Sequence, residues 1–344
     1  MISGHGNNIY QYDSEKITAD FSSNIAYNNH SSKILNFLAG NLDCFCNYPD
    51  PMAERLTAQV ADRVGANPDQ VIITNGSAEA FYLVAHMLSA STEDNVACRT
   101  LITTPSFAEY EDSCQLYKHE ISYIDLENFD SIDLTNFDSL WLASPNNPDG
   151  YRVSLCKIFK TARENEKCKI ILDRAYNNLS SQAEYCRELP ENVILIESFT
   201  KFYGVPGLRL GYIVASAEII AQVNRMRPPW SVNSLSLVAG EYIISHQDEL
   251  KINCDELIGE SQYLQESIAN IGGFNVTPSQ CNFFLVEITS GKSAEELYTY
   301  LLENYGILIR NASNFRGLTP RHFRIAALER GKNNKLIEAL QQWR

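Results

Sequence analysis

The chain has 344 residues, of which 44% are hydrophobic and 20% are charged. This length exceeds the roughly 250–300 residues at which a single core stops growing, so we expect a large structural unit and a smaller second one. A net charge of −14 argues against a nucleic-acid partner, because nucleic-acid phosphates require a basic face. An anionic ligand would instead be bound by a local group of arginines and helix N-termini.

Three further features concern the cellular setting. The sequence contains no apolar run of about 18 residues, so we expect no membrane span. The first residues, MISGHGNNIY, lack the basic start and apolar middle of a signal peptide, which favours a cytoplasmic protein. The nine cysteines are odd in number and lack paired zinc-type spacing, so we expect reduced thiols and no metal site.

Apolar runs alternate with helical stretches from Pro68 to about Ser216. The expected strands lie near Val71, Leu101, Leu140, Ile170, Val193 and Leu210, and the expected helices include 78–88 and 155–166. This alternation predicts an α/β fold with a mainly parallel sheet covered by helices. After Ala217 the pattern becomes helical, and the tail predicts a small α+β unit with strands near Phe284, Ile307 and Phe323.

Polar residues follow several of these predicted strands. VIITNGSAEAF indicates a strand, a glycine turn and a helix, which would leave the backbone amides of Gly76, Ser77 and Ala78 at a helix N-terminus, a suitable anion site. The runs LWLASPNNPDG and KIILDRAYNN place Asn147 and Asp173 at the carboxyl ends of strands, where open α/β sheets bind ligands. Each feature alone is explained as readily by turn chemistry, but turn chemistry does not explain their joint order.

The segment SFTKFYGVPGLRLGY contains Lys201 and, eight positions later, Arg209. A desolvated lysine near cationic groups loses its proton readily and becomes a nucleophile. The Ser198 hydroxyl and the Arg209 guanidinium suit a phosphate group. A lysine between aromatic residues is by itself more often a surface residue. Together with Asp173 as the carboxylate partner of a protonated pyridine nitrogen, the set fits pyridoxal phosphate.

The chain resembles the fold-type I pyridoxal-phosphate enzymes of the class I and II aminotransferase family in the order of NGSAE, TPSFAEY, SPNNPDG, LDRAY, SFTKFYGVPGLRLGY and HFRIA. The resemblance covers nearly the whole chain, in the branch of histidinol-phosphate aminotransferases and threonine-phosphate decarboxylases. The segments HGNNI, DFSSNI, NLDCFCNYPDP and PPWSVNSLSLVAGE make it more similar to the L-threonine O-3-phosphate decarboxylases of cobalamin synthesis. Histidinol-phosphate aminotransferase is the alternative. A non-enzymatic protein that keeps the fold is disfavoured by the retained site residues.

The resemblance implies a fold-type I transferase fold and a homodimer. It implies an N-terminal arm at 1–40 that packs with the small domain, a large α/β domain at 41–245 and a small α+β domain at 246–344.

The same resemblance implies a cofactor site. Lys201 would form the Schiff base, Asp173 would pair with the ring nitrogen, and Phe107 would stack on the ring. Tyr176 and Asn147 would donate to its phenolate oxygen. The cofactor phosphate would be bound by Gly76, Ser77, Ala78, Ser198 and Arg209, with Tyr48 from a second subunit.

The substrate site involves fewer residues. Arg324 alternates with apolar neighbours in RHFRIAAL, so it would project from a packed sheet. The resemblance implies that Arg324 binds the α-carboxylate of the substrate and Arg310 its phosphate, with help from Asn24, Asn147 and His5. If these anchors hold the Cα–carboxylate bond perpendicular to the cofactor ring, CO₂ leaves and (R)-1-amino-2-propanol phosphate forms. If they hold the Cα–H bond there, transamination results, and the sequence does not fix that angle.

The chain departs from the family pattern at three positions. Arg174 stands where relatives often carry an acid, Asp149 where they carry threonine, and Ala78 where a hydroxyl is common. Ala78 still offers its backbone amide, with Ser77 as a compensating hydroxyl.

Overall fold

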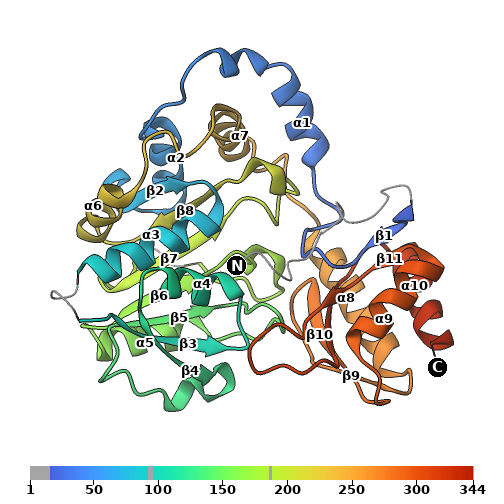
Figure 1. Cartoon of the computed structure of the whole chain (residues 1–344). Coiled ribbons are helices and arrows are strands. Elements are labelled where there is room, and N and C mark those ends of the chain that lie inside the picture. Colours follow the sequence, from blue (N-terminus) through green and yellow to red (C-terminus); the bar gives the residue numbers. More distant parts are fainter. Residues whose placement is uncertain (1–15, 92–95, 186–187, 344) are drawn as a thin grey trace.

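A computed structural model describes residues 16–91, 96–185 and 188–343. A seven-stranded sheet forms the centre of the larger part (Figure 1), in the order β2-β8-β7-β6-β5-β3-β4. Its strands are β2 (Val71–Thr74), β3 (Arg99–Thr104), β4 (Glu120–Asp125), β5 (Ser139–Ala143), β6 (Lys169–Asp173), β7 (Val193–Ser198) and β8 (Gly211–Val214). The pairs from β7 to β4 are parallel, and β8 runs antiparallel to both of its neighbours. The predicted mainly parallel sheet is therefore confirmed.

Helices cover both faces of this sheet, which is why its central strands are almost continuously apolar. One face carries α3 (Gly76–Ala90), α4 (Ala108–Leu116) and α6 (Ala217–Met226). The other face carries α2 (Glu54–Val64), α5 (Leu155–Glu164) and α7 (Ser234–Ser245), with α1 (Ser31–Ala39) packed on α7. Strand β4 was not predicted, because it lies at the edge of the sheet and its residues are only partly buried.

The smaller part contains a four-stranded antiparallel sheet in the order β12-β13-β10-β9. Its elements are α8 (Cys254–Ala269), β9 (Phe274–Val276), β10 (Phe283–Ile288), α9 (Ala294–Tyr305), β12 (Arg310–Asn311), β13 (His322–Ala326) and α10 (Arg330–Gln342). The short strand β1 (Ala19–Asp20) pairs in parallel with β11 (Ile307–Leu308) beside this sheet. The predicted domain boundaries at residues 41 and 246 stay a prediction.

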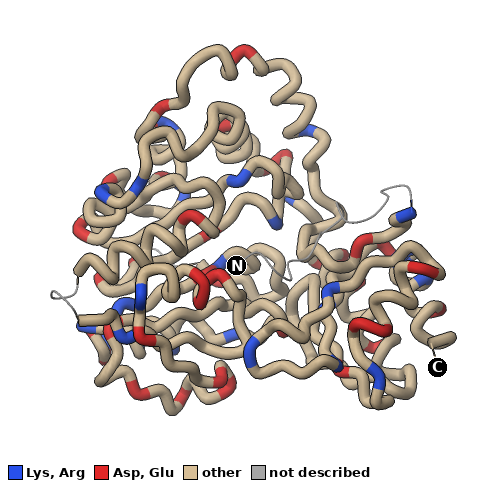
Figure 2. Tube along the Cα trace, in the orientation of Figure 1, with Lys and Arg blue, Asp and Glu red and all other residues tan. Residues whose placement is uncertain are grey.

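Acidic and basic residues are interspersed along the trace of both parts (Figure 2). In the described ranges, no helix has the length and apolar character needed to cross a bilayer. The same residues contain no group of three or more His, Cys, Asp or Glu side chains arranged to hold a metal ion.

Candidate active site

A cavity of about 330 Å³ is lined by residues of both sheets. It lies at the carboxyl ends of β5, β6 and β7, the edge at which open α/β sheets bind ligands. The predicted site residues that the structure brings to its wall are Asn24, Ser77, Ala78, Phe107, Asn147, Asp173, Tyr176, Ser198, Lys201, Arg209, Arg310 and Arg324. Residues from segments far apart in the sequence therefore converge on one small-molecule pocket.

The N-terminus of α3 forms one end of the pocket. Ser77 and Ala78 line the cavity, whereas Gly76 lies just behind them, at the first residue of the helix. Gly76 has a φ of 76°, and a Cβ on it would lie 2.7 Å from the Arg209 guanidinium. The positive φ favours glycine, and the missing Cβ lets the guanidinium pack directly against the helix N-terminus. This combination of amides and a cation suits a phosphate.

Lys201 lies inside the pocket and keeps part of its surface open to it. Desolvation, together with the Arg324 and Arg209 guanidiniums, lowers the pKa of its ammonium from 10.5 to about 8, although Asp173 opposes the shift. A substantial fraction of this amine is therefore neutral near pH 8. A neutral amine is the nucleophilic form.

Asp173, the last residue of β6, is almost fully buried. Its Oδ2 accepts a 2.6 Å hydrogen bond from the Tyr110 hydroxyl, and its Oδ1 accepts one of 2.8 Å from the Ala175 backbone N–H. Burial raises the pKa of the Asp173 carboxyl, and both hydrogen bonds oppose that shift. Tyr110 was not among the predicted site residues, because an aromatic residue on an amphipathic helix is more simply read as core.

A pair of hydroxyls lies beside Lys201. The Ser198 and Thr200 side-chain oxygens are 2.8 Å apart, and the Thr200 backbone N–H donates to Ser198 Oγ at 3.2 Å. Both residues line the cavity. Only Ser198 of the two was predicted from the sequence, because Thr200 lies in the turn after β7 and its direction is not given by strand alternation.

Two buried arginines form the opposite wall. The Arg324 guanidinium donates to Asn147 Oδ1 and, at 2.7 Å, to the Ser22 carbonyl. The Arg310 guanidinium donates to the Asn311 carbonyl and, at 2.8 Å, to Asn314 Oδ1. Among the described residues, neither arginine forms an ion pair with a carboxylate. Desolvation lowers the pKa of both guanidiniums, and Arg324 contributes to lowering that of Arg310 to about 9.

Buried polar atoms at the pocket also fit a polar ligand. Within the described part of the chain, Arg324 Nε is buried and lacks a hydrogen-bond partner, and the buried Asn24 side chain has Tyr176 beside it as a polar neighbour. Buried polar groups are nearly always paired, so the Arg324 Nε–H calls for an acceptor on a ligand. Together with the reactive amine and the buried carboxylate, these groups fit pyridoxal phosphate and an anionic substrate.

The remaining predicted residues lie elsewhere. Tyr48 is 86% exposed and its ring lies 5.5 Å from that of Trp230 in a tilted contact, outside the cavity of its own chain. His5 lies outside the described residues. Asp149 accepts hydrogen bonds of 2.9 Å from Asn146 Nδ2 and the Tyr151 backbone N–H, so it is a turn residue.

The chain is similar to several known proteins. Residues 6–340 match the model of the family "Aminotransferase class I and II". A putative threonine-phosphate decarboxylase of Caldanaerobacter subterraneus is 31% identical over 86% of this chain and 82% of its own length. A histidinol-phosphate aminotransferase of Bacteroides thetaiotaomicron is 30% identical over 86% of both chains.

The adenosylcobalamin biosynthesis bifunctional protein of Leptospira interrogans is 26% identical over 97% of this chain, which spans only 40% of that longer protein. The crystal structure of L-threonine-O-3-phosphate decarboxylase from Porphyromonas gingivalis has 33% identity and a TM-score of 0.89, covering 94% of this chain and 98% of that one. The predicted fold and cofactor are thus confirmed. The chain belongs to the class I and II aminotransferase family, and its cofactor is pyridoxal 5'-phosphate.

Proposed function

We propose that this protein decarboxylates L-threonine O-3-phosphate to (R)-1-amino-2-propanol phosphate. The observation that carries the proposal is the register of β12 and β13, in which Arg310 lies directly opposite Arg324. Like charges in opposite positions of an antiparallel pair are destabilising, and burial increases the cost. Two anionic groups on one small substrate would relieve that repulsion. L-Threonine O-3-phosphate carries a carboxylate and a phosphate a few bonds apart.

The cofactor-binding roles are part of the proposal. Lys201 would bind the cofactor covalently, and Asp173 would hold the ring nitrogen in its protonated form. Phe107 packs edge-on against Phe81 and Tyr110, at 6.3 and 6.0 Å, and this fixes its ring on the cavity wall for stacking. These residues would define the plane of the ring.

Other residues would hold the polar edges of the cofactor. Tyr176 and Asn147 would donate to the ring oxygen. Ser77, Ser198, Thr200 and the α3 N-terminus, with Arg209, would bind the phosphate.

Decarboxylation then depends on orientation. The bound cofactor supplies an electron sink for the bond that breaks at the substrate Cα. Arg324 would hold the substrate carboxylate at the buried wall, while Arg310 would hold its phosphate on the neighbouring strand. Two such anchors would fix the rotation about Cα, and the proposal places the Cα–carboxylate bond, rather than the C–H bond, in the position for cleavage. After CO₂ leaves, Lys201 in its ammonium form would deliver a proton to Cα and become the neutral amine.

Histidinol-phosphate aminotransferase is the alternative, supported by relatives of similar identity. Histidinol phosphate carries a phosphate but no carboxylate, so one of the two opposed arginines would remain without an anion while it is bound. The deciding experiment measures CO₂ release from L-threonine O-3-phosphate, alongside glutamate formation from histidinol phosphate and 2-oxoglutarate. CO₂ with little glutamate supports the decarboxylase, and glutamate without CO₂ overturns it.

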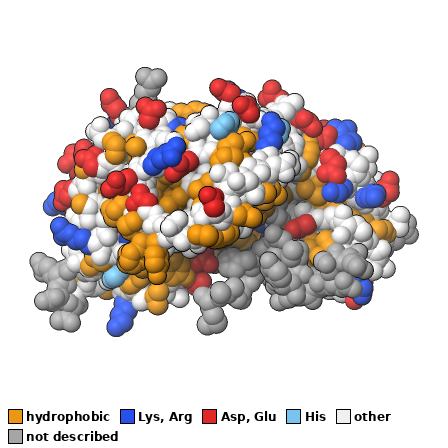
Figure 3. Space-filling model, turned by 90° about the horizontal axis from the view of Figure 1, so that it is seen from above, with side chains coloured by type: hydrophobic (Ala, Val, Ile, Leu, Met, Phe, Trp, Pro, Cys, Tyr) orange, Lys and Arg blue, Asp and Glu red, His pale blue; other side chains and the backbone are white. Residues whose placement is uncertain are grey.

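A second copy of the chain forms part of the proposal. Exposed apolar side chains gather along the segment 42–52 and at Trp230, with Phe45 at 62% and Tyr48 at 86% exposure. The face seen from above carries groups of hydrophobic side chains (Figure 3). Such surfaces mark interaction sites. We propose that two copies dock through this segment, and that Tyr48 reaches the cofactor phosphate of the partner.

A further inference from the structure

At the end of each of strands β6 and β7, one residue faces the pocket and the adjacent residue faces the other way. Asp173 and Ser198 line the pocket, whereas the adjacent Arg174 and Glu197 line a separate cavity of about 930 Å³. This is the alternation expected at strand ends. The Arg174 side chain is only 2% exposed, and its Nε lies 4.0 Å from Glu197 Oε1. A buried charge pair therefore lies directly behind two predicted cofactor-binding residues.

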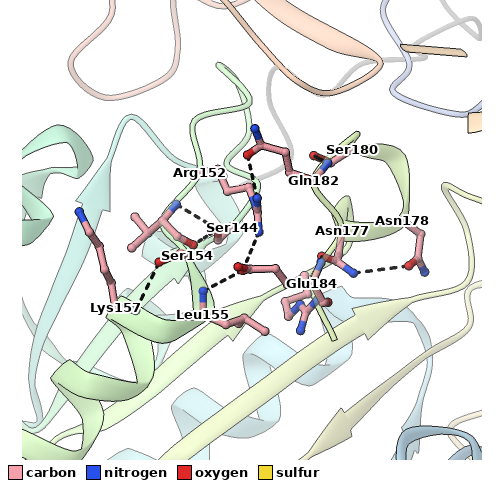
Figure 4. Close-up of polar contacts among 12 residues, drawn as sticks. Ser144, Arg152, Ser154, Leu155, Lys157, Asn177, Asn178, Ser180, Gln182 and Glu184 are labelled. Atoms are coloured by element: carbon pink, nitrogen blue, oxygen red, sulfur yellow. Dashed lines mark hydrogen bonds and ion pairs between the residues drawn. The ribbon is translucent and has the colours of Figure 1, made fainter. Parts of the chain in front are cut away.

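Arg174 also contacts a rigidly held carbonyl. Its guanidinium donates to the backbone oxygen of Glu184. Figure 4 shows how Glu184 is fixed: its carboxylate pairs with Arg152 at 2.6 Å and accepts from the Leu155 N–H at 2.8 Å, and its own N–H donates to Asn177 Oδ1 at 3.0 Å. The position of Arg174 is thus tied to the start of α5 as well as to β7.

Strand β8 is linked to Glu197 through Tyr212. Its hydroxyl donates to Glu197 Oε2 at 2.5 Å. The preceding Gly211 packs so closely that a Cβ would lie 2.9 Å from Gly76 C and Ser77 N. The position of β8 therefore determines where the N-terminal amides of α3 lie.

The two members of the Arg174–Glu197 pair carry opposite charges close to Asp173. Burial raises the pKa of Asp173, and the negative charge of Glu197 raises it further. Arg174 is a cation that lies beside Glu197, on the side of the strands away from the pocket. Removing one member of a buried pair leaves the other charge uncompensated, whereas replacing both is much less costly.

We propose that Arg174, Glu197 and Tyr212 are positioning residues for the cofactor site. They clamp the ends of β6, β7 and β8 from behind, so that the pocket-facing neighbours on those strands and the α3 amides keep their places. The proposal rests on the cofactor and not on which reaction follows.

The test is a double-mutant cycle read by the dissociation constant of pyridoxal phosphate, measured by titrating the cofactor-free protein. We expect Arg174→Gln to weaken binding about 10-fold, because it leaves the Glu197 charge near Asp173 without the Arg174 cation. Glu197→Gln is expected to cost less, and adding it to Arg174→Gln should restore most of the affinity. Unchanged affinity in Arg174→Gln, or a double variant whose loss is the sum of the two single losses, would overturn the proposal.

Two further variants complete the design. Arg99→Gln breaks a more exposed Arg–carboxylate pair, with Asp138 at 3.1 Å, at the amino end of β3, and should leave cofactor affinity unchanged. Tyr212→Phe removes only a hydroxyl and is expected to weaken binding about 5-fold. Melting temperatures of the cofactor-free variants identify any that fail to fold. If Arg174→Gln fails to fold, Tyr212→Phe becomes the deciding variant. A wild-type affinity for pyridoxal phosphate in Tyr212→Phe would then refute the proposal.

Discussion

The Tyr110 hydroxyl donates a 2.6 Å hydrogen bond to Oδ2 of Asp173, so a residue of α4 holds the carboxylate at the end of β6. Asp173 would otherwise be a buried carboxylate supported by one backbone amide. Burial favours the protonated form, in which the group is a poor partner for a pyridinium nitrogen. Tyr110 therefore orients the carboxylate and also favours its charged form.

We predict that Tyr110→Phe weakens pyridoxal phosphate binding about 10-fold, the cost of losing one hydrogen bond to a charged group. The dissociation constant of the cofactor is the measurement. Tyr82→Phe is a matched control, because Tyr82 donates to Glu109 at 3.0 Å between α3 and α4 but does not line the cavity. Equal affinities in Tyr110→Phe and the wild type would contradict this role for Tyr110.

The lowered pKa of Lys201 predicts how cofactor capture depends on pH. Below about pH 8 the amine is mostly protonated and unreactive, so the capture rate should rise through pH 8 and then level off. An unshifted lysine would give a rate that keeps rising toward pH 10.5. Rapid-mixing absorbance with the cofactor-free protein measures the profile.

Substitution of a neighbouring cation tests the cause of that shift. Arg324→Gln removes a charge that lowers the pKa of Lys201, so the midpoint should move to higher pH. Arg321→Gln removes an arginine that instead pairs with Glu287 at 2.7 Å and should leave the midpoint in place. A midpoint that moves equally in both variants would argue against a local effect of Arg324.

The sequence predicted the reactive and anion-binding residues of the pocket better than the residues that hold them in position. Lys201, Asp173 and Arg209 lie in segments whose order along the chain is diagnostic of the family, and the structure brings them to one cavity. Tyr110 and Thr200 were missed, because a single aromatic or hydroxyl residue has an ordinary structural explanation until its neighbours are known.

The pairing register of β12 and β13 was also not predicted from the sequence. Arg310 and Arg324 were each predicted to meet the substrate. Their direct opposition depends on the path of the loop between β12 and β13, which no local pattern determines. Arg174 was noted only as a departure from the family pattern, and its partner Glu197 becomes visible once β6 and β7 are neighbours.

The opposed arginines predict a selective loss. Arg310→Gln should lower kcat/KM for L-threonine O-3-phosphate about 100-fold, because a buried charge-assisted contact to the phosphate is removed. Any turnover of unphosphorylated L-threonine should change little, since that substrate has no group for Arg310. Arg310→Lys keeps the positive charge but lacks the planar guanidinium. Its kcat/KM for L-threonine O-3-phosphate should lie between those of the wild type and Arg310→Gln. Equal losses for both substrates would exclude a phosphate-binding role.

A contact between the two parts of the molecule predicts a salt effect. Arg316, on the loop that carries Asn314 and Phe315, forms a two-pronged bond to Glu111 of α4 at 2.6 and 3.0 Å. Arg316 is half exposed, so the pair is screened by salt. Glu111→Gln should therefore raise KM for the phosphorylated substrate a few-fold and remove most of the wild-type dependence of KM on ionic strength.

The matched control for this contact is Glu287→Gln. It breaks the Arg321 pair, which has similar exposure and a 2.7 Å distance but ties β10 to β13 away from the pocket. Its KM should show the wild-type salt dependence. The same loss of salt dependence in Glu287→Gln would show that the effect belongs to surface charge in general.

The exposure of Tyr48 predicts complementation between inactive proteins. If Tyr48 completes the pocket of a second copy, Lys201→Ala and Tyr48→Ala should each lose activity when alone. Mixed dimers of the two would contain one pocket with both an intact Lys201 and an intact Tyr48 from the partner. Unfolding and refolding the two variants together should therefore restore activity, with sedimentation confirming a dimer. Because a Tyr48 that served its own chain would produce no such recovery, an inactive mixture of well-folded dimers would rule out the shared site.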